Sequence, residues 1–338
     1  MLRESDVRRA GVLAILLAAS GIGCGGPSKA EMTHKPKDVF GKLAHAEAEM
    51  PCHPIEQAGP IPTAPPKRTD ADFEYDVVFY LAHPEDETLF TPATMEALVR
   101  EKKRVFEVVL SHGEGGRLLE RDATGRVSEK IGVPPDKVAE VRDREFARVM
   151  KTLGLEYEHL FPASAGTDFA ASDVAGRERA IHACHETLER WDVIIPDGVA
   201  TMLKKLVTSI RMKRPRVIVT HDHRDDEDWL DHGHHKALGA LVEIAARAAA
   251  DPRVPGIPPH VVEELVSIAP KQFPADVTLT LGNDMRKRLV AANTSQFEPA
   301  KFAEVAQRTE ERYVVRWRAK GTEKPPGGSY LAQLAKAK

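Results

Sequence analysis

Short apolar runs alternate with longer amphipathic segments from residue 76 onward. Residues 76–82 and 105–110 are almost continuously apolar, which is typical of strands buried on both faces of a parallel sheet. A third run, residues 216–220, is short and rich in β-branched side chains. We therefore expect these segments to be strands of one sheet.

Helical spacing marks the segments between and after these runs. Apolar residues recur there every three or four positions, as on the buried face of an amphipathic helix. Asp136 and Asp197 are suited to cap two of these helices, and Gly154 is a suitable stop. Helices are expected at residues 94–103, 136–153, 177–191, 197–210 and 236–249.

The alternation of strands and helices implies a parallel sheet with helices on both faces. We predict a single Rossmann-like α/β domain with a mostly parallel sheet over residues 71–320. Residues 25–70 are rich in proline, which disfavours helix interiors and central strands, and they are expected to form a tether. Residues 321–338 are expected to form a polar tail.

The N-terminus has the pattern of an export signal. Arginines precede an apolar run at residues 10–23, and small residues lead from it to Cys24. The run is shorter than the roughly 20 apolar residues that a membrane-spanning helix needs. The residues before Cys24 resemble a bacterial lipobox, with Gly21 in place of the usual Leu. Residues 1–24 are therefore expected to be a lipoprotein signal with lipidation at Cys24; an ordinary signal peptide is the alternative.

Export would place the remaining cysteines in a compartment where disulfides can form. Cys52 and Cys184 would have the chance to pair in an oxidising periplasm, although two isolated thiols fit the sequence equally well. We expect an exported, periplasmic protein that is held at a membrane only by its N-terminal lipid.

The composition is that of a globular protein. The chain has 338 residues, of which 42% are hydrophobic and 29% charged, and its formal net charge is −3. This balance fits a soluble domain with a sizeable core. It argues against nucleic acid as a partner, because phosphate binding needs a clustered basic surface. The pattern predicts no particular oligomeric state.

Histidines and acids follow each predicted strand. They lie at residues 83–87, 111–117 and 221–223, and the last group leads to a His-rich segment at 231–235. Parallel topology brings these strand ends to one edge of the sheet, where α/β proteins bind their ligands. Imidazole and carboxylate groups suit zinc, and a catalytic site uses three of them with one position open to water.

The turn after the first strand is the best candidate for a metal site. His83 and Asp86 are three residues apart in a turn opened by Pro84, so both side chains can face one ion. The third ligand is expected from residues 231–235. No nucleophile elbow, P-loop or dinucleotide fingerprint competes with this interpretation.

Five segments, in order over residues 76–297, resemble the PIG-L/LmbE deacetylases. Residues 82–87, Ala-His-Pro-Glu-Asp-Glu, resemble that family's Ala-His-Pro-Asp-Asp-Glu signature. The other segments are similar to its Thr-Arg-Gly-Glu-Gly-Gly, Arg-x-x-Glu…Leu-Gly, His-Pro-Asp-His-Arg-Ala-x-Gly and His-x-Ser-Gln motifs. They lie at residues 111–116, 142–154, 232–239 and 294–296. The resemblance implies an LmbE-like fold.

The resemblance also implies roles for individual residues. It makes His83, Asp86 and His235 the ligands of Zn²⁺ or another divalent metal. It makes Glu85 the general base that takes a proton from water, and His232 the group that stabilises the oxyanion or protonates the leaving amine. The implied substrate-binding residues are Arg142, which would contact sugar hydroxyls, and Glu114, which would support the loop or the substrate.

Three positions depart from the family pattern. Glu85 stands where the family has Asp, His112 replaces an Arg, and His234 replaces an Asp. The leading interpretation is a zinc-dependent hydrolase that removes an N-acetyl or other N-acyl group from an amino sugar or sugar conjugate. A glycan-binding lipoprotein with the same fold and impaired catalysis is the alternative. Glu85 as a ligand with Asp86 as the base is a further alternative within the enzyme.

Overall fold

The structure, a computed structural model, describes residues 59–162, 184–224, 233–270, 272–280, 282–325 and 327–336. The predicted signal, Cys24, Cys52, most of the predicted tether and His232 lie outside these residues. None of the helices in the described part of the chain is both long and apolar enough to cross a lipid bilayer.

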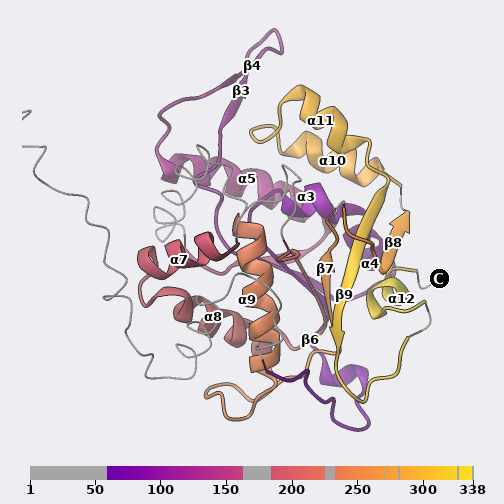
Figure 1. The fold of residues 1–338 in the computed structure, drawn as a ribbon. Coiled ribbons are helices and arrows are strands. Elements are labelled where there is room, and N and C mark those ends of the chain that lie inside the picture. Colours follow the sequence, from indigo (N-terminus) through magenta and orange to yellow (C-terminus); the bar gives the residue numbers. More distant parts are fainter. Residues whose placement is uncertain are drawn as a thin grey trace, which may run out of the picture. The chain divides into compact units, whose positions relative to one another are not determined.

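A seven-stranded sheet forms the centre of the domain (Figure 1). Every strand except β9 runs in the same direction, which confirms the predicted mostly parallel α/β sheet. The strand order is β5 (Glu156–His159), β2 (Val105–Val109), β1 (Tyr75–Leu81), β6 (Pro215–Thr220), β7 (Glu264–Ile268), β9 (Glu310–Arg318) and β8 (Val277–Thr280).

Successive side chains of β1 pack alternately into two separate apolar cores, one on each face of the sheet. Val78 and Tyr80 pack in one core and Phe79 and Leu81 in the other, as the two-residue period of a strand requires. The first core includes α7 (Cys184–Ile194), α8 (Gly198–Lys213) and α9 (Gly233–Ala249). The second includes α4 (Pro92–Arg100), α5 (Pro135–Leu153), α10 (Asp284–Ala292) and α12 (Tyr330–Lys336). Helices therefore cover both faces, as predicted.

The remaining described elements lie outside this layered arrangement. A short 3-10 helix, η3 (Asp70–Asp72), precedes β1. A separate hairpin of β3 (Leu119–Arg121) and β4 (Val127–Glu129) projects beyond the sheet (Figure 1). Helices α3 (Asp86–Phe90) and α11 (Pro299–Ala306) complete the list.

The ends of the domain differ from the predicted tether and tail. The backbone of Ala64 and Lys320 is hydrogen-bonded at 2.8 Å, so the end of the predicted tether is docked on the domain. Residues 330–336 of the predicted polar tail form α12, whose Leu331 is fully buried in the second core. The apolar residues of α12 span only two turns, too few for the helical period to stand out in the sequence.

A buried ion pair fixes the start of α4 next to α3. The Glu311 carboxylate accepts the backbone N–H groups of Ala93 and Thr94, each at 2.8 Å, and lies 2.7 Å from Arg286 Nη2. Arg286 Nη1 also donates to the carbonyl oxygen of Thr88 at 3.0 Å. These contacts hold the segment that follows the predicted metal-binding turn, because a buried charge is stable only when it is paired and hydrogen-bonded.

Candidate metal centre

One carboxylate oxygen of Asp86 is fully engaged by the turn that follows β1. Asp86 Oδ2 accepts the backbone N–H groups of Ala82 and His83 at 3.0 and 2.9 Å, and His221 Nε2 lies 3.1 Å from it. Asp86 Oδ1 is buried and accepts no hydrogen bond. The turn therefore presents Oδ1 as an available ligand atom.

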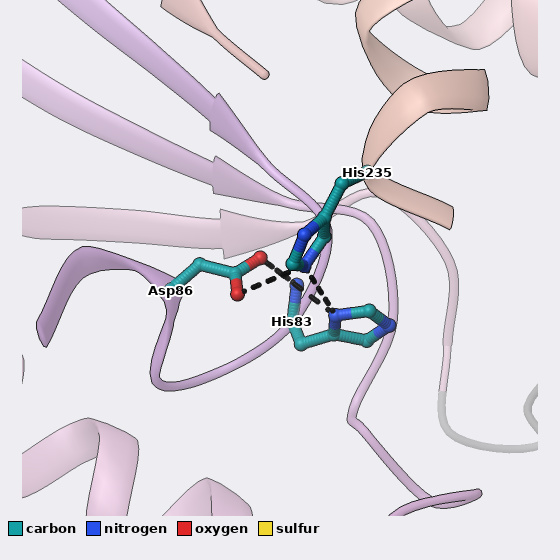
Figure 2. A group of neighbouring side chains, drawn as sticks. All are labelled: His83, Asp86 and His235. Carbon is teal, nitrogen blue, oxygen red and sulfur yellow. Dashed lines mark hydrogen bonds and ion pairs between the residues drawn. The ribbon is translucent and has the colours of Figure 1, made fainter. Parts of the chain in front are cut away.

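The structure brings together the three ligands that the resemblance implied. His235, in the first turn of α9, places Nε2 3.1 Å from Asp86 Oδ1 and 3.3 Å from His83 Nδ1. Figure 2 shows the three side chains pointing toward one another at the end of β1. Their ligand atoms all lie within 4.8 Å of one another, and all three residues are buried.

The protonation states suit a divalent cation. Burial lowers the pKa of His83 well below its usual value, so that this imidazole is neutral and keeps a lone pair for a metal. Burial alone would raise the pKa of Asp86, but the imidazoles of His235 and His221 hold it well below its usual range. Two imidazoles and one carboxylate, whose Oδ1 is buried, fit a zinc-type ion.

Two further histidines orient these ligands. His83 Nε2 lies 3.1 Å from His234 Nδ1, and the ring of His221 stacks on that of His235 with centroids 4.0 Å apart. A metal-binding histidine commonly uses its second ring nitrogen as His83 does here, whereas His221 contacts His235 by ring stacking. Their position relative to the ligands depends on tertiary packing, so the sequence alone did not assign them. His223, by contrast, meets Arg316 Nη2 at 3.2 Å.

Glu85 places a second carboxylate beside the cluster. Its backbone has φ +115°, in the left-handed region that only glycine adopts without strain, and Glu87 Oε2 accepts its N–H at 3.0 Å. Its Oε2 is buried, accepts no hydrogen bond and lies 3.5 Å from Arg142 Nη1. Burial, only partly offset by Arg142, raises the pKa of Glu85 well above its usual value. Such a carboxylate has a high proton affinity.

Arg142 on helix α5 contacts both the glycine-rich loop and Glu85, in the turn after β1. The buried guanidinium of Arg142 lies against Gly113 and Gly116 so closely that a Cβ at either position would overlap it. Arg142 also donates to Gln296 Oε1. Its terminal nitrogens face protein groups, and the contact with substrate hydroxyls that the resemblance implied stays a prediction. Glu114 is buried in the same loop.

One helical turn further, Glu145 holds the C-terminal Thr-Ser-Gln segment. Its carboxylate accepts the backbone N–H of Ser295 at 3.0 Å, the Ser295 hydroxyl at 2.6 Å and the Thr294 hydroxyl at 3.1 Å. Three of the motif segments predicted from the sequence thus meet at one side of the cluster. His232, the predicted acid, lies outside the described residues.

Gly239 sets the distance between α9 and the end of β6. A Cβ at this position would overlap the backbone carbonyl of His221, which has no flexible end to move aside. We expect Gly239→Ala to destabilise the protein by about 1–3 kcal/mol and to weaken metal binding, because α9 carries His235. Urea unfolding and metal titration measure both effects. Gly282→Ala is the control, since a Cβ at Gly282 would meet nothing within 4 Å; equal stability of the two variants would contradict the prediction.

Comparison with known families and proteins adds an independent line of evidence. The PIG-L profile, described as GlcNAc-PI de-N-acetylase, matches residues 78–246. A 1D-myo-inositol 2-acetamido-2-deoxy-alpha-D-glucopyranoside deacetylase of Catenulispora acidiphila, deacetylase 3, is 30% identical over 220 residues, which cover 64% of this chain and 58% of that protein. The chain spans a little over half the length of this and similar curated relatives.

Solved structures share the fold at low sequence identity. The N,N'-diacetylchitobiose deacetylase from Pyrococcus horikoshii has a TM-score of 0.53 at 13% identity, over 71% of this chain and 84% of that one. The 4-carboxy-2-hydroxymuconate hydratase of Pseudomonas putida KT2440 has a TM-score of 0.51 at 14% identity, over 73% and 99%. Proteins with different reactions share this architecture, so the reaction has to be argued from the site.

Proposed function

The chain belongs to the PIG-L family, whose profile covers half of it, and on this premise we propose that it is a metal-dependent N-deacetylase acting on an N-acetylated amino sugar or sugar conjugate. The observation that carries the proposal is the buried cluster of His83, Asp86 and His235 with the carboxylate of Glu85 beside it. An amide hydrolase of this type needs three metal ligands and an adjacent base. We propose zinc as the ion, although other divalent metals fit the same donor atoms.

In the proposed reaction, metal binding and proton transfer are assigned to different residues. His83, Asp86 and His235 would hold a divalent ion, which would supply the Lewis-acid chemistry for activating water and polarising the amide carbonyl. Glu85 Oε2 takes the proton of the attacking water, and Arg142, 3.5 Å away, fixes the direction of this carboxylate. Burial raises the pKa of the Glu85 carboxyl, which favours its taking a proton from water and then returning it as an acid.

The leaving amine needs a proton and the developing oxyanion needs a donor. The family resemblance assigns these roles to His232, and this assignment is part of the proposal. Glu114, buried in the glycine-rich loop beside Arg142, is proposed to support the loop or a sugar hydroxyl. The proposed substrate is an N-acetylglucosamine conjugate, because the curated relatives are named for deacetylation of such a compound.

Acetate release tests this function. The purified protein with added Zn²⁺ is incubated with 1D-myo-inositol 2-acetamido-2-deoxy-alpha-D-glucopyranoside, N,N'-diacetylchitobiose and N-acetylglucosamine. We expect equimolar acetate and free amine from at least one of them, and no release after treatment with a chelator. Saturable sugar binding without acetate release would favour the glycan-binding alternative. Neither binding nor release from any of the three would contradict an amino-sugar substrate.

We also propose that the protein is exported and anchored by a lipid on Cys24. Cys184 is disulfide-bonded. Disulfides persist mainly in oxidising compartments such as the periplasm, which supports export. We expect labelled fatty acid to be incorporated into the wild type but not into Cys24→Ser, which should become soluble in the periplasm. Membrane attachment of Cys24→Ser, or a cytoplasmic location of the wild type, would rule out the proposed anchor.

A further inference from the structure

A second group of side chains that could bind a metal lies at the same edge of the sheet, at the ends of β2 and β5. His112 follows β2, His159 ends β5, and Asp143 comes from α5. Strands β2 and β5 are parallel neighbours, and β2 also pairs with β1, so the second group lies beside the first at the carboxyl edge of the sheet. One ligand atom from each of the three residues lies within 4.8 Å of the others.

Backbone carbonyls hold both imidazoles in the orientation that ligands need. His112 Nε2 lies 3.1 Å from the carbonyl oxygen of Phe161, and His159 Nδ1 lies 3.2 Å from that of Ser111. A metal-binding histidine typically donates its other N–H to such an acceptor, which fixes the tautomer. The opposite nitrogens, His112 Nδ1 and His159 Nε2, then face the same carboxylate, Asp143 Oδ1, at 2.8 and 3.5 Å.

The tautomer set by a backbone carbonyl favours a cation between these groups. Because His159 Nδ1 directs its N–H at the carbonyl oxygen of Ser111, His159 Nε2 keeps a lone pair directed at the Asp143 carboxylate. A lone pair and a carboxylate oxygen at this distance repel each other unless a proton or a cation lies between them. The Asp143 side chain is 37% exposed, so a hydrated ion reaches the group directly from solvent.

The two rings also limit the affinity of such a site. Their centroids are 3.8 Å apart and their planes differ by only 16°. Lone pairs in nearly parallel planes do not converge on one point, so the rings have to tilt apart when an ion binds. This rearrangement makes the second group weaker than the buried first cluster.

We propose that His112, Asp143 and His159 form a second, weaker site for a divalent transition-metal ion of the Zn²⁺ class. An ion there would join the loop after β2 to β5 and α5. The loop contains Gly113 and Gly116, which pack on Arg142, the neighbour of Asp143 in sequence. Occupancy would therefore stiffen the wall of the proposed active site without contributing a ligand to it.

Zn²⁺ titration of the full chain, followed by calorimetry, tests the second site. Asp143→Asn and His159→Ala should each weaken one class of binding by at least about tenfold, since even outer partners of a metal ligand are worth 10–100-fold. The control is Glu140→Gln, which removes an exposed carboxylate from the same helix, one engaged only by Lys137 and Arg144. It should leave every binding class unchanged.

A pair of variants separates this site from the first cluster. His83→Ala should keep the weaker Zn²⁺-binding class, and His83→Ala combined with Asp143→Asn should lose it. The comparison within the pair cancels any binding by other parts of the chain. Titrations of Asp143→Asn and His159→Ala that match the wild type within twofold, or no difference within the His83→Ala pair, would overturn the proposal. Asp143→Asn preserves the shape of an exposed side chain, so loss of the fold is not expected to obscure the result.

Discussion

Replacing His83 or His235 with alanine is expected to abolish the tighter class of metal binding and acetate release together. The two imidazoles and Asp86 Oδ1 form the cluster, and each substitution leaves only two ligands. Loss of a direct ligand should cost more than the roughly 10–100-fold in metal affinity seen for outer partners. Zn²⁺ titration, which separates the tighter from the weaker class of binding, and acetate release after reconstitution with Zn²⁺ measure the two effects.

His260→Ala is the matched control for these substitutions. His260 is also a buried histidine, but its Nε2 meets the carbonyl oxygen of Pro215 at 2.8 Å, at the opposite end of β6 from the cluster. The control should lose some stability and keep its metal. If His83→Ala and His235→Ala both bind metal as the wild type does, the proposed centre is wrong.

Substituting Glu85 with glutamine is expected to lower kcat by about 10²–10⁴-fold while leaving metal content unchanged. Glutamine keeps the size of the side chain but cannot take a proton from water. Glu85 Oε2 lies beside Arg142 and is not among the clustered ligand atoms, so the ion should be retained. The expected pattern is therefore a loss of turnover that is separate from metal loss.

Glu85→Asp supplies the matched comparison. Asp is the residue that the family uses at this position, and it preserves the charge while shortening the side chain by one methylene. We expect it to retain much more activity than Glu85→Gln. If Glu85→Gln loses its metal while Asp86→Asn keeps it, the two residues have exchanged roles. A Glu85→Gln variant within threefold of the wild-type kcat would exclude Glu85 as the base.

The parts predicted correctly from the sequence are those with a strong local signal. The buried strands β1, β2 and β6 are largely apolar or β-branched runs. In α5 and α8, apolar residues recur at helical spacing over several turns. Strand β5 was not predicted, because its residues are largely exposed and polar and so give no apolar run. As a result, His159 had no predicted strand end, and the group that it forms with His112 and Asp143 was not foreseen.

Side-chain roles depended on distances between segments far apart in the chain. The sequence placed Arg142 in a family motif, but only packing shows it between the glycine-rich loop and Glu85. Likewise, His221 and His234 gained their contacts with His235 and His83 from the way α9 docks on β6 and β1. Local spacing carries no information about such pairings.

The α/β class and the order of the motifs follow from the sequence alone, because apolar periodicity and turn chemistry are local properties. The sequence also determines which residue types are available to bind a metal. Tertiary packing determines which of them meet, which contacts each oxygen of Asp86 makes, and that Glu85 Oε2 is buried beside Arg142. Those features arise from non-local packing at the carboxyl edge of the sheet, where loops from separate strands converge.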